Sequence, residues 1–245
     1  MNNSVNAQKG IYFISDAHLS FHNGPVEILL RSFLKSIKGK ASHLYILGDL
    51  FDFWLEYKHV IPAAFLKTLA ILLELKESGI KIYYLPGNHD FWMADYLERQ
   101  AGVKLCPETY EIEHFSKQIH LFHGDGLAYG DHGYRMLKKL FRCKPLIWLY
   151  KQLPVDLAYR IADRTSHASR EYTKDKPKDL QGYYDYAAHK IREGAQVVMM
   201  GHTHHPEMKY LEDGLYINTG DWLTHNSYVV LDSDGFRLEY YKTKE

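Results

Sequence analysis

The stretch that decides the fold is IKIYYLPGNHDFW, residues 80–92, in which an apolar run is followed at once by polar side chains. Residues 80–85 have the length and continuous apolar character of a strand that is buried on both faces. Asn88, His89 and Asp90 come soon after it, and such groups are costly to desolvate unless something binds them. Gly, Asn and Asp are also the usual residues at which a strand reverses. One junction of this kind, taken alone, is therefore more often a turn than a site.

Four further apolar runs end in the same way: IYFIS (11–15), HLYIL (43–47), QIHLF (118–122) and QVVMM (196–200). The polar residues that follow these four runs are Asp16 and His18, then Gly48 and Asp49, then His123, Gly124 and Asp125, and finally Gly201, His202, Thr203 and His204. Binding crevices in open α/β sheets form at the carboxyl ends of the strands. The five junctions therefore predict one shared site.

The order of the elements predicts an α/β fold. Helix-like segments at about 25–38 and 62–78 separate the first three apolar runs, and this alternation is typical of βαβ units in a largely parallel sheet. After residue 204 the runs MKYLE, LYINTG, SYVVLD and FRLEYY, divided by DG and SDG turns, predict consecutive antiparallel strands. We expect two packed sheets with helices outside.

Residues 126–190 break this pattern, because they are helical in period and contain no convincing strand. They hold 13 Lys and Arg against 7 Asp and Glu in a chain whose formal net charge is zero. We therefore expect a core made of residues 1–125 and 191–245, and a basic helical cap made of residues 126–190.

The bulk composition limits the class of protein. A neutral chain of 245 residues has no overall charge that would attract nucleic acid, so no nucleic-acid partner is expected, and nothing indicates an obligate protein partner. Cys106 and Cys143 form no CxxC pair, which is typical of reduced thiols in a cytoplasmic protein. The sequence shows neither a signal-peptide segment nor a run of about 18 uncharged apolar residues.

The donors at the five junctions are carboxylates, an amide and imidazoles, which suit Mn²⁺, Fe²⁺ or Zn²⁺. Seven candidate ligands are too many for one ion, whereas two ions can share a bridging carboxylate. We expect Asp49 to be that bridge. One ion would then take Asp16, His18 and His204, and the other Asn88, His123 and His202.

In this order, DxH, GD, GNHD, H and GHTH resemble the signature of the calcineurin-like metallophosphoesterase superfamily, across residues 16–204. The resemblance implies a four-layer α-β-β-α sandwich that hydrolyses phosphoric esters or anhydrides at two metal ions. It makes Asn88 a metal ligand. It also makes His89 and Asp90 catalytic, with His89 facing the leaving group as a proton donor or charge-stabilising contact and Asp90 holding it.

Three further stretches are similar to the bacterial UDP-2,3-diacylglucosamine pyrophosphatases of lipid A biosynthesis: LGDLFDFW, HGDGLAYGDHGYR and the pattern from Leu153 to Arg164. This similarity implies hydrolysis of UDP-2,3-diacylglucosamine to UMP and 2,3-diacylglucosamine 1-phosphate (lipid X) with two Mn²⁺ ions. It implies an acyl-binding cap and a peripheral location on the cytoplasmic face of the inner membrane. The implied substrate contacts are Asn88, His89, Asp131, Tyr134, Arg164, Ser169, Lys176 and His202.

The chain departs from that family at several positions. His89 and His205 each stand where the family has Arg, Ser166 also replaces an Arg, and Thr173 replaces an Asn. These departures leave open a soluble metal-dependent phosphodiesterase or a pyrophosphohydrolase of another nucleotide. A non-catalytic metal-binding scaffold is a third reading, which the retention of His89 and of all seven ligands argues against.

Overall fold

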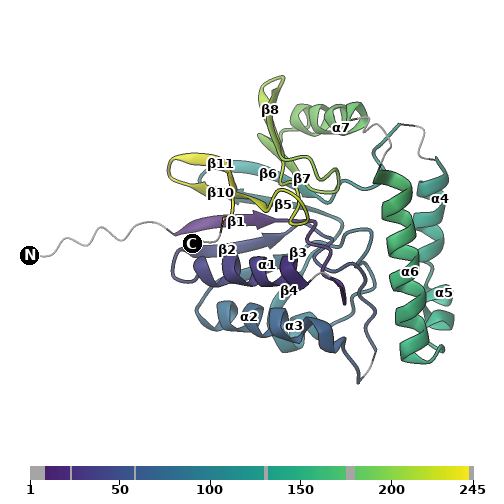
Figure 1. Cartoon of the computed structure of the whole chain (residues 1–245). Helices are drawn as coiled ribbons and strands as arrows, with labels where there is room; N and C mark the ends of the chain where they lie inside the picture. The colour runs from purple at the N-terminus through teal and green to yellow at the C-terminus, as the bar shows by residue number, and fades with distance from the viewer. Residues whose placement is uncertain (1–8, 23, 58, 130–131, 175–179, 243–245) are drawn as a thin grey trace, which may run out of the picture.

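The computed structural model of the chain describes residues 9–22, 24–57, 59–129, 132–174 and 180–242, without the side chains of residues 132, 134, 137 and 167–174. Two sheets form its centre, with the strand orders β11-β10-β1-β2-β3-β4 and β5-β6-β7-β9-β8. Figure 1 shows them stacked on each other, with helices on both outer sides.

The first sheet is parallel from β1 to β4 and antiparallel at β10 and β11. Its strands are β1 (Gly10–Ile14), β2 (Ala41–Ile46), β3 (Lys81–Tyr84), β4 (Val103–Leu105), β10 (Ser227–Asp232) and β11 (Gly235–Tyr240). The helices on its outer face are α1 (Gly24–Ser36), the short η1 (Ala63–Phe65), α2 (Leu66–Glu77) and α3 (Tyr96–Ala101).

The second sheet combines one parallel centre with two antiparallel edges, because β6, β7 and β9 run parallel while β5 and β8 run against their neighbours. Its strands are β5 (Thr109–His114), β6 (Lys117–Phe122), β7 (Val197–Met200), β8 (Glu207–Leu211) and β9 (Gly214–Asn218). Helix α7 (Gln181–Arg192) covers its outer face (Figure 1).

Three buried apolar clusters correspond to the three interfaces between layers. Leu34 of α1 packs with Ile46 of β2 outside the first sheet, while Phe13 of β1 packs with Met199 of β7 between the sheets. Tyr183 of α7 belongs to the cluster outside the second sheet. Successive side chains of a strand point to opposite faces, so continuous apolar runs such as β1 serve two clusters. The predicted four-layer α/β sandwich is therefore confirmed.

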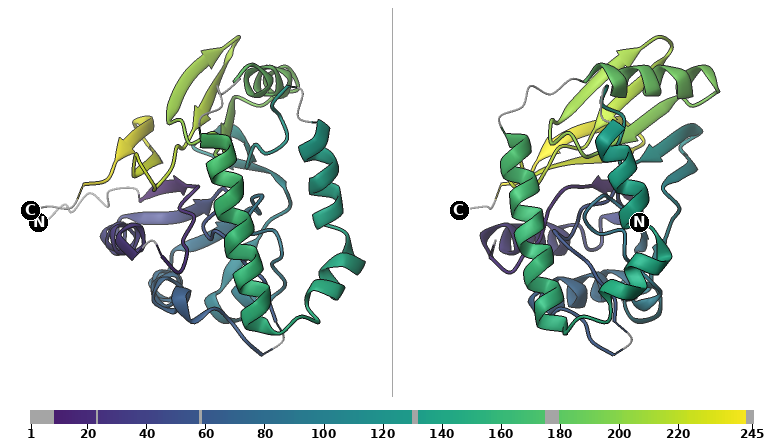
Figure 2. Two further views of the ribbon diagram at one scale, coloured as in Figure 1. Left: turned by 45° about the vertical axis from the view of Figure 1, so that its right-hand side comes forward. Right: turned by 90° about the vertical axis from the view of Figure 1, so that its right-hand side faces the viewer.

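The remaining helices form a cap at one end of the sandwich: α4 (His132–Phe141), α5 (Lys144–Tyr150) and α6 (Val155–Lys174). Figure 1 shows them beyond the carboxyl ends of β1 and β2, and both views of Figure 2 show α6 and the α4–α5 segment as two arms joined at one end. Most of helix α7 falls inside the range 126–190 predicted for the cap, but the helix packs on the second sheet.

The cap is attached to the sandwich by polar contacts. Lys138 Nζ lies 2.8 Å from the buried carboxylate of Asp125, and the indole N–H of Trp92 donates to the carbonyl of Phe141 at 2.9 Å. The hydroxyl of Tyr159 donates to the carbonyl of Leu55 at 3.0 Å. Both arms of the cap are thus fixed to loops that leave the strand ends.

Two details of the sheets differ from the prediction. The strands after residue 204 do form antiparallel hairpins, but β8–β9 joins the second sheet while β10–β11 joins the first. Strands β4 and β5 were not predicted: β4 has three residues, and β5 alternates polar and apolar residues at a sheet edge.

Candidate metal centre

The five predicted junctions meet at one edge of the sandwich, where backbone hydrogen bonds connect their loops. The amide of His18 donates to the carbonyl of Asp49 at 2.9 Å, and the amide of Gly201 donates to the carbonyl of His123 at 3.0 Å. The amide of His202 donates to Asp16 Oδ2 at 2.8 Å and so connects the two sheets. The site therefore spans both sheets.

Asp16, His18 and His204 form the first group of donors, with one ligand atom from each residue within 4.8 Å of the others. The Nε2 atoms of His18 and His204 are 3.1 Å apart, and Asp16 Oδ1 lies 3.3 Å from His204 Nε2. Asp16 and His18 are almost fully buried. The composition of this group agrees with the prediction.

Asp49, His123 and His202 form the second group. His123 Nε2 lies 3.0 Å from Asn88 Oδ1 and 3.3 Å from Asp49 Oδ2. The same Asp49 oxygen lies 3.8 Å from His18 Nε2, in the first group. Asp49 therefore occupies the position between the two groups that a bridging ligand requires.

The spacing of these donors fits metal ions. Two ligands at about 2.1 Å from one ion and roughly 90–110° apart are separated by about 3.0–3.4 Å, and the His18–His204, Asp16–His204, Asn88–His123 and Asp49–His123 distances are between 3.0 and 3.3 Å. Asp16 Oδ1 is buried and makes no hydrogen bond within the described residues, as expected of an oxygen whose partner is a cation.

The electrostatics of the site lead to the same conclusion. Burial lowers the pKa of His18, but the neighbouring carboxylates of Asp16 and Asp52 and the charge of Asp49 outweigh burial and raise that pKa to about 10. Burial likewise lowers the pKa of His123, and the charge of Asp49 and its hydrogen bond raise it to about 10. The buried carboxylates thus hold protons on imidazoles that would otherwise be neutral at pH 7, and a bound cation would replace those protons.

The orientation of His123 is set by the main chain. Its Nδ1 lies 2.7 Å from the carbonyl oxygen of Leu47, at the end of β2. Since a carbonyl only accepts, Nδ1 carries the hydrogen and Nε2 is directed at Asp49 and Asn88. Such a contact fixes the tautomer of a metal-binding imidazole.

Five of the seven predicted ligands have left-handed backbone torsions. Their φ angles are between 44° and 65°, and they are Asp16, His18, Asp49, His202 and His204. Non-glycine residues seldom adopt this conformation, and such residues cluster at functional sites, where the surrounding structure compensates for the strain.

Two glycines permit the loops to approach so closely. A Cβ atom on Gly87 would lie 2.0 Å from Asp49 Oδ1, and one on Gly201 would lie 2.4 Å from Asp16 Oδ2. Any side chain at either position would therefore displace a predicted metal ligand.

His89 and Asp90 lie at this site with different neighbours from those expected. The Asp90 carboxylate accepts hydrogen bonds from the amides of Asp49, Phe51 and Gly87 and from the hydroxyl of Tyr84, so it organises the backbone around Asp49. His89 Nδ1 lies 3.1 Å from the carbonyl oxygen of Asp52, and the rings of His89 and His18 are 4.8 Å apart. The expectation that Asp90 holds the His89 ring is therefore replaced by contacts with Asp52.

The remaining predicted substrate contacts belong to the cap. Arg164 lies on α6 with an exposed side chain. Asp131 and Lys176 lie outside the described residues, and so do the side chains of Tyr134 on α4 and Ser169 on α6.

Sequence reasoning missed three residues around the donors. Asp52 Oδ1 lies 3.5 Å from His18 Nδ1, and Asp221 Oδ2 lies 3.6 Å from His204 Nδ1. Ser166 of α6 contacts both Asp52 and His89. The carboxylates in GDLFD and NTGD could have been noticed, since metal-binding imidazoles usually have such partners. No local signal identifies Ser166.

A two-sheet sandwich with donors for divalent cations at one end, and a histidine beside them, defines a metal-dependent phosphoesterase. The chain belongs to the calcineurin-like phosphoesterase family, whose model matches residues 10–206. It is similar to three bacterial proteins named UDP-2,3-diacylglucosamine hydrolase. The protein from Porphyromonas gingivalis is 32% identical over 94% of this chain and 96% of its own. The one from Neisseria meningitidis is 33% identical over 93% and 96%, and the one from Haemophilus influenzae is 30% identical over 93% and 97%.

Proposed function

We propose that this protein hydrolyses the pyrophosphate of UDP-2,3-diacylglucosamine. Water would add to the α-phosphorus, the bond from that phosphorus to the bridging oxygen would break, and UMP and 2,3-diacylglucosamine 1-phosphate would be released. The proposal is supported by the three relatives of that name, each aligned over more than nine-tenths of this chain, and by a donor set suited to divalent cations.

The observation that carries the proposal is the position of Asp49 Oδ2, 3.8 Å from His18 Nε2 and 3.3 Å from His123 Nε2. A shared carboxylate between two donor groups is the arrangement that holds two cations close together. We propose that Asp16, His18, Asp49 and His204 hold one ion, that Asp49, Asn88, His123 and His202 hold the other, and that both are Mn²⁺. Such ions supply Lewis-acid polarisation of a phosphoryl group and activation of water.

Within this proposal His89 acts on the leaving group. Its Nδ1 is held by the carbonyl of Asp52, so Nε2 is the nitrogen left to interact with substrate. A proton or positive charge at that nitrogen would stabilise the oxygen that departs with the β-phosphate. Asn88 and His202 would contact the phosphate as well as the metal.

The cap is proposed to bind the acylated part of the substrate and the membrane surface. Met136, Leu140, Trp148 and Leu149 are between 51% and 73% exposed, and a hollow of about 540 Å³ is lined by Gly133, Met136, Lys139, Leu140 and Cys143. Exposed apolar side chains next to lysines are typical of proteins that lie on anionic lipid. Among the described helices, none is both long and apolar enough to cross a bilayer.

The test is an assay of Mn²⁺-loaded protein with UDP-2,3-diacylglucosamine, in which UMP is measured by chromatography and bound metal by elemental analysis. Asp49→Asn should lose both ions and at least about 10³-fold in rate, since it removes the shared ligand. Absence of UMP from a protein that carries two ions and hydrolyses bis(p-nitrophenyl) phosphate would refute the substrate but not the chemistry.

A second candidate is a metal-dependent phosphodiesterase or pyrophosphohydrolase of another nucleotide. It is favoured by one observation: His89 and Ser166, two positions where the chain departs from the pyrophosphatase pattern, contact each other. Turnover of a nucleotide ester that carries no acyl chains, at a rate above that of the lipid, would select this candidate.

A further inference from the structure

Among the side chains of α6 that the structure describes, that of Ser166 reaches the metal centre. Only 7% of this residue is exposed. Its hydroxyl donates to Asp52 Oδ1 at 2.6 Å, and the same oxygen lies 3.0 Å from His89 Nδ1. Ser166 therefore touches both the histidine proposed to act on the leaving group and the carboxylate beside it.

The hydrogen bonds around His89 leave one arrangement of protons. A serine hydroxyl has a single hydrogen, and that hydrogen is directed at Asp52 Oδ1. The Ser166 oxygen can then only accept from His89, as can the Asp52 carbonyl oxygen, 3.1 Å from the same nitrogen. Both neighbours of Nδ1 are acceptors, so Nδ1 carries a hydrogen and Nε2 is the atom presented to the site.

We propose that Ser166 is a positioning residue, which keeps Nδ1 of His89 as a hydrogen-bond donor and holds the ring in the orientation that directs Nε2 at the site, and so makes the placement of α6 a determinant of the rate. The proposal rests on the proposed role of His89 in phosphoester hydrolysis. It adds a second task to the cap, which would orient a group of the core as well as bind substrate.

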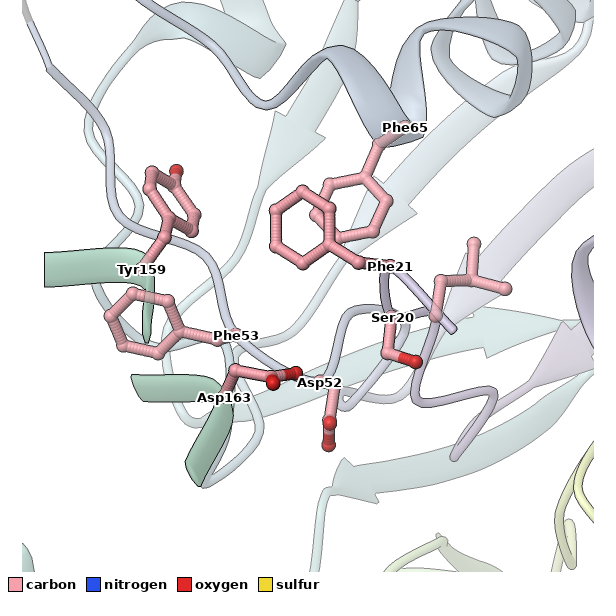
Figure 3. Close-up of a pocket in the computed structure, with 8 residues that line it drawn as sticks. Ser20, Phe21, Asp52, Phe53, Phe65, Tyr159 and Asp163 are labelled. Atoms are coloured by element: carbon pink, nitrogen blue, oxygen red, sulfur yellow. The ribbon is translucent and has the colours of Figure 1, made fainter. Parts of the chain in front are cut away.

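The rest of α6 is placed firmly enough for this task. Figure 3 shows Tyr159 and Asp163 of α6 beside Phe21, Phe53 and Asp52, around a hollow of only about 10 Å³. The Tyr159 ring packs edge-on against Phe21 and Phe53, with ring centroids 5.8 Å away in each case. Tyr159, seven positions before Ser166, is thus packed against the loop that carries Asp52. This packing fixes the distance between Ser166 and His89.

The first measurement concerns the imidazole itself, and needs no substrate. In Zn²⁺-loaded protein with ¹⁵N-labelled histidine, the His89 signals are assigned by their loss in His89→Gln. Ser166→Ala should shift the Nδ1 signal of His89, because this nitrogen loses one of its two hydrogen-bond acceptors. The matched control is Thr165→Val on the same helix, because among the described residues the Thr165 hydroxyl bonds carbonyls of its own helix, those of Ile161 and Ala162. An unchanged His89 signal in folded Ser166→Ala would overturn the proposal.

The second measurement is a double-mutant cycle on Mn²⁺-loaded protein with bis(p-nitrophenyl) phosphate, a substrate without acyl chains. Ser166→Ala should lower kcat about 3- to 10-fold, the size expected for one hydrogen bond, with little change in KM, and Ser166→Thr should restore most of it. In the His89→Gln background Ser166→Ala should have less than about a 2-fold effect, since its partner is gone. Additive effects of the two substitutions would overturn the proposal. If the wild type hydrolyses neither bis(p-nitrophenyl) phosphate nor UDP-2,3-diacylglucosamine, the proposed function fails while the ¹⁵N measurement still tests Ser166.

Discussion

At the scale of single residues, the site combines strained backbone with crowded side chains. The five ligands with positive φ each cost on the order of 1–3 kcal/mol in backbone strain, and the carboxylates beside them are almost completely buried. Neither feature helps folding. Both place several oxygens and imidazoles around the same two points, which is the geometry that cations require.

His89 should affect the rate without affecting the metals. His89→Gln should keep both ions and lower kcat about 10²–10⁴-fold, the usual contribution of a general acid. If His89 donates a proton, the loss should be larger for esters of phenol than for those of p-nitrophenol, because a poorer leaving group needs the proton more. Unimpaired turnover of both esters would remove His89 from the mechanism.

Gly87→Ala should disrupt the centre by steric means alone. The added methyl group would lie 2.0 Å from Asp49 Oδ1, so the loop or the carboxylate must move, at about 1–3 kcal/mol of stability. Elemental analysis should show loss of metal, with activity reduced about 10²-fold or more. Gly24→Ala, at the start of α1 where nothing lies within 4 Å, is the control and should keep its metals. Full metal content in Gly87→Ala would show that the loop adapts.

At the scale of elements, the role proposed for the cap in substrate recognition is separate from the chemistry proposed for the core. Its two arms contribute exposed apolar side chains, and Lys138 connects α4 to Asp125, which follows β6. The arms are therefore fixed to the core, and under the proposed function they would also offer a surface to lipid.

Replacing Trp148 and Leu149 with Ser should impair acylated substrate selectively. Both side chains lie on α5 and are 66% and 59% exposed, and loss of such apolar contacts costs roughly 1.5–3 kcal/mol each. KM for UDP-2,3-diacylglucosamine should rise at least about 10-fold, binding to anionic vesicles should weaken, and hydrolysis of bis(p-nitrophenyl) phosphate should be unaffected. Tyr210→Ser on β8, where the tyrosine is 82% exposed, controls for loss of any surface aromatic. Equal effects of both variants would argue against the lipid role of α5.

At the scale of the whole molecule, charge is separated between the two parts of the fold. The chain is neutral overall, the range 126–190 is basic, and the centre of the core holds buried carboxylates that keep the imidazoles of His18 and His123 protonated. Metal binding, protonation and stability are therefore linked.

Metal affinity should increase with pH. In the metal-free protein the pKa values of His18 and His123 are raised to about 10, so both imidazoles are protonated at pH 7 and their pairing with the carboxylates is lost only as the pH approaches 10. A cation must displace these protons, and each displaced proton changes the affinity by up to about tenfold per pH unit. Calorimetry in buffers of different ionisation enthalpy should detect release of up to two protons. Affinity that stays constant from pH 6 to pH 8 would contradict the raised pKa values.

The sequence by itself determined strands β1, β2, β3, β6 and β7 and placed the seven candidate ligands at their ends. Each strand is a short local run, such as residues 80–85, and each ligand lies within a few residues of the end of such a run. Local hydrophobic periodicity and the rule that parallel strands end at a common edge were enough to predict that distant segments meet.

Only the tertiary structure decided what surrounds those ligands. Helix α7 is helical in sequence like the cap, but the apolar face of the second sheet binds it. Residues 109–114 form strand β5 because their backbone pairs with the edge of β6. Ser166 meets His89 across 77 positions of sequence. No local pattern encodes such pairings, because the free energy that selects them comes from burying side chains between segments that are adjacent only in the folded chain.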